Sequence, residues 1–244
     1  MQLDARRNII IPGDDKKTLD YCVKSWIQIA KHAINKYGQF SVALSGGSTP
    51  KAIFERLVQE HRHDLDWSKV LLFWGDERSV EPDHPDSNFY MAMNCGFDDL
   101  PVQKYRMKAE KNLKENAAEY ERIINERLPG GTFDLIMLGM GDDGHTASLF
   151  PHTEGLKESH KAVIANYVPQ KTTWRMTFTY KQIHNARQIF VYVLGKNKAN
   201  MVHRVLQGAE TPEDFPSQNL GLVDHPATWI LDEGAASLLQ IQRD

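Results

Sequence analysis

The sequence predicts an α/β domain of three layers, with a mostly parallel sheet in the middle and helices on both faces. Short apolar runs alternate with amphipathic stretches along the 244 residues, as strands alternate with helices around parallel sheets. Several of the runs are apolar at every position, which is typical of strands covered on both faces. No internal repeat, low-complexity segment or break in composition marks a boundary, so we expect residues 1–244 to form a single domain.

The elements of the first half follow from apolar spacing and from capping residues. Asp14 or Asp15 begins a helix that Gly38 ends, with apolar side chains at helical spacing between them. Pro50 suits the first turn of a second helix, and Thr49 before it is the expected cap. This half is predicted to hold strands over 40–44 and 70–74 and further helices over 88–93 and 113–128.

The second half continues the alternation and contains one long loop. Strands are predicted over 133–138, 175–180, 189–194 and 229–231, and a helix over 199–206. The loop covers residues 208–226 and includes three prolines. Because loops of that length in a compact domain are often functional, we expect it to border the functional site.

Composition excludes several classes of protein. The 29 basic and 32 acidic residues give a net charge of −3, so no basic face for nucleic acid is expected. The amino-terminal residues lack a signal peptide, and no apolar run reaches the roughly 20 residues of a membrane helix. Cys22 and Cys95 are far apart and form no CxxC pair, which argues against disulfides and cysteine zinc sites. We therefore expect a reduced, soluble, cytoplasmic protein.

The first candidate for a binding site is a glycine turn between a strand and a helix. Its residues are Ser45, Gly46, Gly47, Ser48 and Thr49. Such a turn presents backbone N–H groups and the positive end of a helix dipole, which together suit a phosphate. The segment matches neither the Walker A pattern nor GxGxxG, so a tight turn before a capped helix stays open as the alternative.

The second candidate follows the strand over 70–74. Asp76, Glu77 and Arg78 stand at the carboxyl edge of the predicted sheet, where ligands bind in open α/β folds. Arg78 offers a planar fork to a carboxylate or phosphate, and Asp76 is expected to contact the same ligand. A solvated loop is the alternative.

The third candidate follows the strand over 133–138. His145 stands between a glycine-rich turn and an expected helix start at Thr146 and Ser148, so it is the best candidate for a general base. Asp143 is expected to orient it or to hold a substrate hydroxyl. A metal site is not expected, because His152 follows His145 by seven positions, which is not the i,i+4 spacing of a helical pair, and no HExxH motif is present.

The fourth candidate is a pair of late cations, Arg175 at the start of a strand and Lys198 after Gly195. Either could neutralise a phosphate, and either could be an ordinary surface charge.

In order along the chain, these segments resemble the 6-phosphogluconolactonases. The matching motifs are LSGGSTP at 44–50, WGDERSV at 74–80, HPDSN at 84–88, LGMGDDGHTASLFP at 138–151 and RMTFTYKQIHNARQIFVYVLGKNKA at 175–199. The resemblance covers nearly the whole chain. It implies a Rossmann-like three-layer sheet of the glucosamine-6-phosphate deaminase type. It also implies hydrolysis of 6-phospho-D-glucono-1,5-lactone in the oxidative pentose phosphate pathway, with no cofactor.

The resemblance also assigns roles to residues. The turn over 45–49, Arg175 and Lys198 hold the phosphate in such enzymes, and His145 corresponds to the base that activates water. Arg78 and Asp143 lie in the substrate pocket. The expected partner is a small sugar phosphate lactone, with no nucleic acid or membrane partner, and the oligomeric state is left open.

The nearest rival is a glucosamine-6-phosphate deaminase or isomerase on the same fold. The deaminases carry a glutamate five positions after the histidine and a tyrosine at the position of Arg78. This sequence has Phe150 in place of that glutamate and Arg78 in place of that tyrosine, and both differences favour the lactonase. Two further functions stay open, a sugar-phosphate sensor without catalysis and, with less support, a metal-dependent hydrolase.

Overall fold

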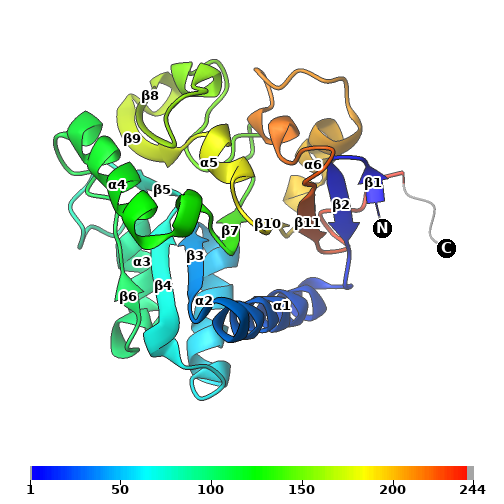
Figure 1. Ribbon diagram of the computed structural model, residues 1–244. Coiled ribbons are helices and arrows are strands. Elements are labelled where there is room, and N and C mark those ends of the chain that lie inside the picture. Colours follow the sequence, from blue (N-terminus) through cyan, green and yellow to red (C-terminus); the bar gives the residue numbers. More distant parts are fainter. Residues whose placement is uncertain (1, 241–244) are drawn as a thin grey trace.

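The computed structural model describes residues 2–240. An eight-stranded sheet forms the centre of the protein (Figure 1). The strand order is β1-β2-β11-β10-β7-β3-β4-β6, and every pair except β1–β2 is parallel. The predicted mostly parallel sheet is thus confirmed. The strands are β1 (Gln2–Asp4), β2 (Arg7–Ile10), β3 (Phe40–Leu44), β4 (Val70–Trp74), β6 (Gln103–Lys104), β7 (Leu135–Leu138), β10 (Ile189–Val193) and β11 (Ala227–Leu231).

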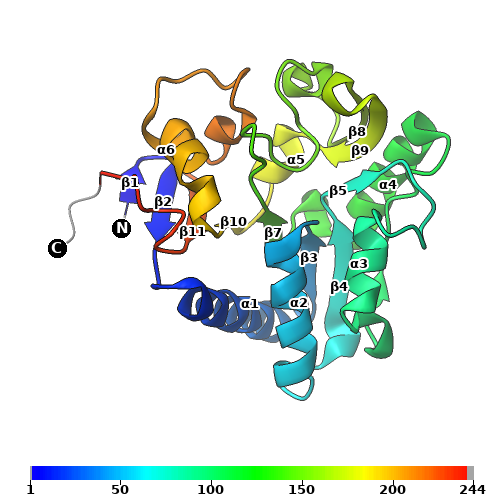
Figure 2. The same cartoon turned by 180° about the vertical axis from the view of Figure 1, so that it is seen from behind.

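Helices cover both faces of this sheet. Every residue of β3, β4, β7 and β10 is buried, which requires cover on each side. In Figure 2, α2 and α3 lie in front of β3 and β4. Figure 1 shows the same strands from the opposite side. The helices are α1 (Asp15–Tyr37), α2 (Ser48–His61), α3 (Asn88–Asn94), α4 (Leu113–Arg127), α5 (Tyr180–His184) and α6 (Ala199–Gln207). None of them within residues 2–240 is long and apolar enough to span a membrane.

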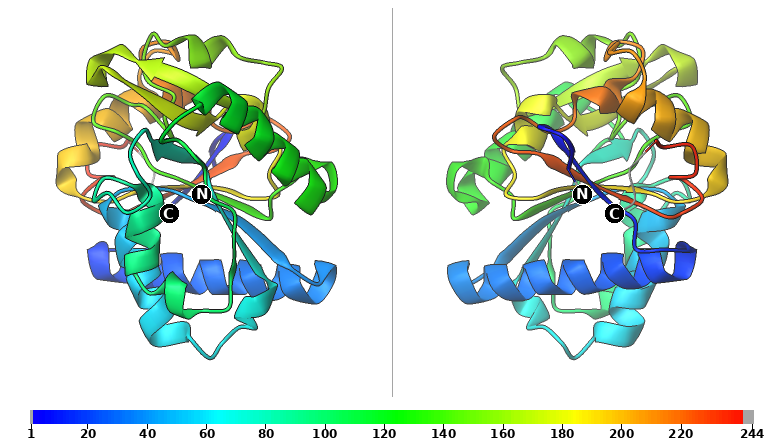
Figure 3. Two further views of the ribbon diagram at one scale, coloured as in Figure 1. Left: turned by 90° about the vertical axis from the view of Figure 1, so that its left-hand side faces the viewer. Right: turned by 90° about the vertical axis from the view of Figure 1, so that its right-hand side faces the viewer.

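A second, smaller sheet lies at the carboxyl edge of the first. Its order is β5 (Asp76–Arg78), β9 (Thr173–Phe178) and β8 (Val163–Val168), and both pairs are antiparallel. Only Gly75 separates β4 from β5, and its N–H donates to the Leu44 carbonyl at the end of β3. Figure 3 shows this sheet and α1 at opposite ends of the molecule. The sequence predicted β9, with bounds of 175–180 in place of the observed Thr173–Phe178. It did not predict the partner strands β5 and β8.

The polar group that fixes the end of β4 is the hydroxyl of Tyr120. It accepts a hydrogen bond from the Trp74 N–H at 2.9 Å and donates one to the Tyr105 carbonyl at 2.9 Å. Phe73, the neighbour of Trp74, packs against the Tyr105 ring at 4.6 Å. Burial raises the pKa of Tyr120 far above its usual range, so the phenol stays neutral. Tyr120 therefore ties α4 to the strand that leads into Asp76.

Replacing Tyr120 with phenylalanine is expected to lower the free energy of unfolding by about 1–3 kcal/mol, because the buried Trp74 N–H loses its acceptor. Urea denaturation of the wild type and the variant measures the difference. Tyr167→Phe is the matched control, since Tyr167 is 40% exposed. Equal midpoints for Tyr120→Phe and the wild type would contradict this role for the hydroxyl.

Candidate active site

Three loops meet at the carboxyl ends of neighbouring strands. The chain passes from β3 outward to β4 and β6 and then returns to β7 on the other side of β3. The direction of winding thus reverses between β3 and β7, and ligands bind at such points in open α/β sheets. The loops that leave β3, β4 and β7 are the three glycine-containing segments singled out in the sequence.

Two adjoining cavities lie between these loops. The smaller, of about 180 Å³, is lined by Ser45, Gly46, Gly47, Asn88 and the 139–141 turn, and the larger, of about 510 Å³, by Arg175, Ser148 and Lys171 among others. Four residues belong to both: Asp76, Arg78, His145 and Ala147. The structure thus brings together seven of the predicted site residues. Ser48, Thr49, Asp143 and Lys198 do not line either cavity.

His145 is held in one orientation by Asp143. The Asp143 Oδ1 lies 2.5 Å from His145 Nδ1 and also accepts the backbone N–H of His145 at 3.1 Å. An ionised carboxylate can only accept, so Nδ1 carries a proton, and in the neutral imidazole Nε2 is then the nitrogen with the lone pair. Burial alone would raise the pKa of Asp143, but the hydrogen bonds from His145, and the positive charge of its ring when protonated, outweigh burial and hold that pKa below its usual value. The dyad therefore has the form of a general base with its orienting acid.

The imidazole of His145 is also in close contact with Phe150 and with the glycine turn. The ring of Phe150 stacks on it, with centroids 3.9 Å apart and planes inclined by 15°. A Cβ at Gly141 would overlap the imidazole, so only glycine lets the turn pass this close. These contacts leave few orientations for the ring.

No helix begins after His145, so that prediction was wrong. Residues 146–149 form a tight turn, in which the Leu149 N–H donates to the Thr146 carbonyl and Ala147 has a left-handed φ of 48°. The reason is that Ser148 makes long-range hydrogen bonds, through its N–H to Thr177 and its hydroxyl to Asp76. These contacts compete with the helix, and local sequence does not reveal them.

The loop over 208–226 packs against the backbone of the His145 segment. The Ser217 N–H donates to the Gly144 carbonyl at 2.9 Å, and its hydroxyl contacts the His145 carbonyl at 3.3 Å. Tyr180 donates to the Pro216 carbonyl at 2.8 Å, which fixes the loop from the other side. This loop therefore supports the site from behind and lines neither cavity. Nothing in the sequence singled out Ser217.

Arg78 and Arg175 face each other across β5 and β9. They are register partners in the antiparallel pair, and the Nε of each is buried without a hydrogen-bond partner among residues 2–240. Arg78 donates through Nη1 to the Asp86 carbonyl at 2.7 Å. Burial, and then the charge of Arg78, lower the pKa of Arg175. Two close guanidinium groups with free donors favour an anion between them.

The turn over 45–49 leaves helix α2 uncapped. Gly47 is the N-cap residue with a φ of 104°, which glycine adopts without strain, and no side chain in the described chain caps the helix. Thr49 is therefore not the cap, contrary to the prediction, because α2 begins one residue earlier, at Ser48. Its first N–H groups stay available for an anion at the positive end of a 14-residue helix.

Asp76 and Glu77 are neighbours with different tasks. Asp76 lines both cavities, whereas Glu77 points to the start of α3 and accepts from the backbone N–H groups of Arg78, Asn88 and Phe89, each at 2.8 Å. The Ser87 hydroxyl adds a fourth hydrogen bond at 3.1 Å. Burial raises the pKa of Glu77 despite these donors. Glu77 therefore holds the loop that carries Arg78 and is not free to act as a base.

Glu77→Gln is expected to destabilise the protein by about 3 kcal/mol, because an amide N–H₂ would face buried donors in place of a carboxylate oxygen. Urea unfolding measures this change. Glu126→Gln serves as the control, because Glu126 is an exposed residue that pairs with Arg122. If Glu77→Gln unfolded at the same urea concentration as the control, this capping role would be refuted.

Lys198 lies beside the His145 loop and is paired. Its ammonium contacts Asp142 Oδ1 at 2.5 Å and the Met140 carbonyl at 3.2 Å. No group of three or more His, Cys, Asp or Glu side chains within residues 2–240 is arranged to hold a metal ion.

Comparison with known proteins places the chain in a family. Residues 13–229 match the family model described as glucosamine-6-phosphate isomerases/6-phosphogluconolactonase. The chain belongs to this family. A 6-phosphogluconolactonase of Chlamydia trachomatis serovar D is 39% identical over 232 residues, which cover 93% of this chain and 88% of that protein. Another from Nostoc sp. is 37% identical over 218 residues, covering 86% of this chain and 88% of the relative.

Solved structures agree with this assignment. A 6-phosphogluconolactonase from Trypanosoma cruzi superposes with a TM-score of 0.86 at 29% identity and covers 99% of both chains. A monomeric glucosamine-6-phosphate deaminase superposes with a TM-score of 0.79 at 21% identity, over 95% of this chain and 100% of the deaminase. The second likeness concerns the fold alone.

Proposed function

We propose that this protein hydrolyses 6-phospho-D-glucono-1,5-lactone to 6-phospho-D-gluconate, the lactonase step of the oxidative pentose phosphate pathway. The observation that carries the proposal is the His145–Asp143 dyad, which opens onto cavities that also hold Arg78 and Arg175. A base beside buried cations suits a lactone that bears a phosphate. The names of the relatives support the same reaction.

In the proposed mechanism, His145 Nε2 removes a proton from water while the water oxygen bonds to C1 of the lactone. The carbonyl oxygen becomes an oxyanion, which Arg78 or N–H groups of the glycine turns stabilise. The bond between C1 and the ring oxygen then breaks, and the proton on His145 passes to that oxygen. Asp143 stabilises the imidazolium between these steps, and the new carboxylic acid ionises in water. No covalent intermediate is needed.

The phosphate of the substrate is held by the 45–49 turn and Arg175. The uncapped N–H groups of α2 and the unpartnered Nε of Arg175 support this assignment. Lys198 is the third cation of the proposed phosphate site. To bind the phosphate, its ammonium group must first leave Asp142. A fixed phosphate orients C1 relative to His145, and orientation of this kind contributes to the rate.

We also propose the cytoplasm as the compartment. Cys22 and Cys95 are both buried and free, as is usual for proteins kept in a reducing environment. Burial raises the pKa of each thiol, to about 12 for Cys22 and about 11 for Cys95, so neither is a reactive thiolate.

Parallel assays on one preparation test the proposed function. The lactonase predicts rapid loss of freshly made δ-lactone, unaffected by a chelator, and no ammonia from glucosamine 6-phosphate. Ammonia release would identify a deaminase. Binding of 6-phosphogluconate without any faster loss of lactone would identify a sensor, and chelator sensitivity would identify a metal-dependent hydrolase.

A further inference from the structure

We propose that Ser148 is a positioning residue that holds the Asp76 carboxylate away from Arg78 and Arg175, so that neither guanidinium group is ion-paired with Asp76 and both can bind the anionic group of the ligand. The Ser148 hydroxyl is buried and donates to Asp76 Oδ2 at 2.7 Å. This inference rests on the proposed function only in that the ligand is a phosphorylated sugar acid or its lactone.

The charges around Asp76 make such a restraint necessary. Asp76 is 6% exposed, and its negative charge acts on Arg175 across β5 and β9. Yet no ion pair joins Asp76 to Arg78 or Arg175 in the part of the chain that the structure describes. A buried carboxylate beside two under-partnered guanidinium groups would be expected to pair with them. Something must therefore hold it in another direction.

Two neutral side chains donate hydrogen bonds to Asp76. Ser148 donates to Oδ2, and Asn88 donates through Nδ2 to Oδ1 at 3.3 Å and to the Asp76 carbonyl at 2.9 Å. Each carboxylate oxygen thus has a neutral donor. The hydrogen bond from Ser148, at 2.7 Å, is shorter than the one from Asn88 to the carboxylate, at 3.3 Å, so we take Ser148 as the main restraint.

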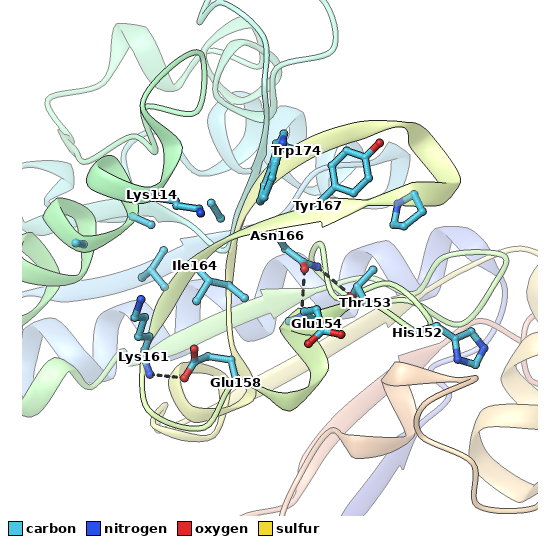
Figure 4. A pocket seen from close by; sticks show the side chains of 16 residues that line it. Lys114, His152, Thr153, Glu154, Glu158, Lys161, Ile164, Asn166, Tyr167 and Trp174 are labelled. Carbon is cyan, nitrogen blue, oxygen red and sulfur yellow. Dashed lines mark hydrogen bonds between the residues drawn. The ribbon is translucent and has the colours of Figure 1, made fainter.

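Ser148 is itself fixed by two further residues. Its N–H donates to the Thr177 hydroxyl at 3.1 Å, and its carbonyl accepts from Asn166 Nδ2 at 2.9 Å. Asn166 is buried and also bonds to Thr153 and to the Gly155 N–H, as Figure 4 shows in part. These bonds lie in the wall of a separate pocket that shares no lining residue with the two cavities of the site. The restraint on Asp76 is therefore anchored outside the site.

The inference predicts a specific effect on ligand binding. In Ser148→Ala the carboxylate is free to turn toward the guanidinium groups and compete with the ligand for them. We expect the Kd for 6-phosphogluconate to rise about tenfold, and the KM for the lactone to rise with it while kcat changes little. Ser148→Cys, whose thiol is a weak donor, should give an effect in the same direction.

Calorimetric titration with 6-phosphogluconate tests the inference in a double-mutant cycle with Asp76→Ala. If Ser148 acts through Asp76, Ser148→Ala has no effect on the Kd once Asp76 is alanine. Ser41→Ala is the matched control, because the buried Ser41 hydroxyl donates to the Asp134 carboxylate at 2.9 Å, remote from the site. It should lower stability and leave the Kd unchanged.

Two results would overturn the inference. One is a wild-type Kd in both Ser148 variants. The other is an equal loss of affinity for 6-phosphogluconate when Ser148→Ala is introduced into the wild type and into the Asp76→Ala variant. Circular dichroism of each variant verifies that it is folded, and if the alanine variant does not fold, the cysteine variant decides. Because the cycle measures the Kd for 6-phosphogluconate, its result does not depend on the assay of lactone hydrolysis. A wild type that binds 6-phosphogluconate but does not hydrolyse the lactone would refute the proposed function and leave this cycle interpretable.

Discussion

His145→Ala is expected to reduce kcat by about 10²- to 10⁴-fold, the usual contribution of a general base. The expectation follows from the geometry, since Asp143 engages Nδ1 and leaves Nε2 as the other ring nitrogen of a residue that lines both cavities. KM should change little, because the binding groups are the 45–49 turn and the arginines. Steady-state hydrolysis of fresh δ-lactone, corrected for its spontaneous loss, gives both constants.

His152→Ala is the control for this experiment. His152 lies on the same segment, but its side chain is 63% exposed, pairs with Asp214 and lines neither cavity of the site. Its replacement should leave kcat near that of the wild type. A His145→Ala variant with the full kcat would remove His145 as the base, and Asp76 would then be the remaining carboxylate to test.

The second large effect is expected for Arg175→Ala, which should raise KM about 10- to 100-fold with little change in kcat. The variant loses charge-assisted hydrogen bonds to the phosphate, each of which stabilises by about 1.5–3 kcal/mol. If the ground state and the transition state lose the same contact, the loss is seen in KM. Titration with 6-phosphogluconate should show a parallel rise in Kd.

Lys198→Ala provides a graded comparison for Arg175→Ala. In the free protein the charge of Lys198 is balanced by Asp142, whereas the Nε of Arg175 has no partner among residues 2–240. We therefore expect a smaller rise in KM for Lys198→Ala. The exposed Arg122, which pairs with Glu119 and Glu126 on α4, controls for loss of a positive charge. An unchanged KM in Arg175→Ala would remove that residue from the phosphate site.

Much of the fold could be predicted because its central strands are continuous apolar runs. The runs over 40–44 and 70–74 coincide with β3 and β4, and the two cavities of the candidate site lie at the carboxyl ends of these strands. The small antiparallel sheet was harder to foresee. Its strand β5 is only Asp76–Arg78, three charged residues that local propensity assigns to a loop. Pairing with β9, about a hundred residues away, is what makes it a strand.

The site shows the same division between local and long-range signals. His145 and Asp143 could be singled out as candidates because they are close in sequence and of the types that a base and its partner require, and the structure shows them in contact. The sequence could not separate Asp76, which faces the cavities, from Glu77, which caps α3. The direction of each side chain depends on Asn88 and Ser148, and contacts between distant segments leave no periodic pattern.

The central claim is that His145 activates water to open a phosphorylated δ-lactone at C1. Single-turnover hydrolysis in ¹⁸O-labelled water, with the wild type in excess and His145→Ala alongside, tests it most directly. The account predicts lactone loss far faster than the spontaneous rate, one ¹⁸O atom in the carboxylate of the product, none in its phosphate, and a large loss of rate in the variant. A folded wild type that does not accelerate the reaction, or label found in released phosphate, would contradict it.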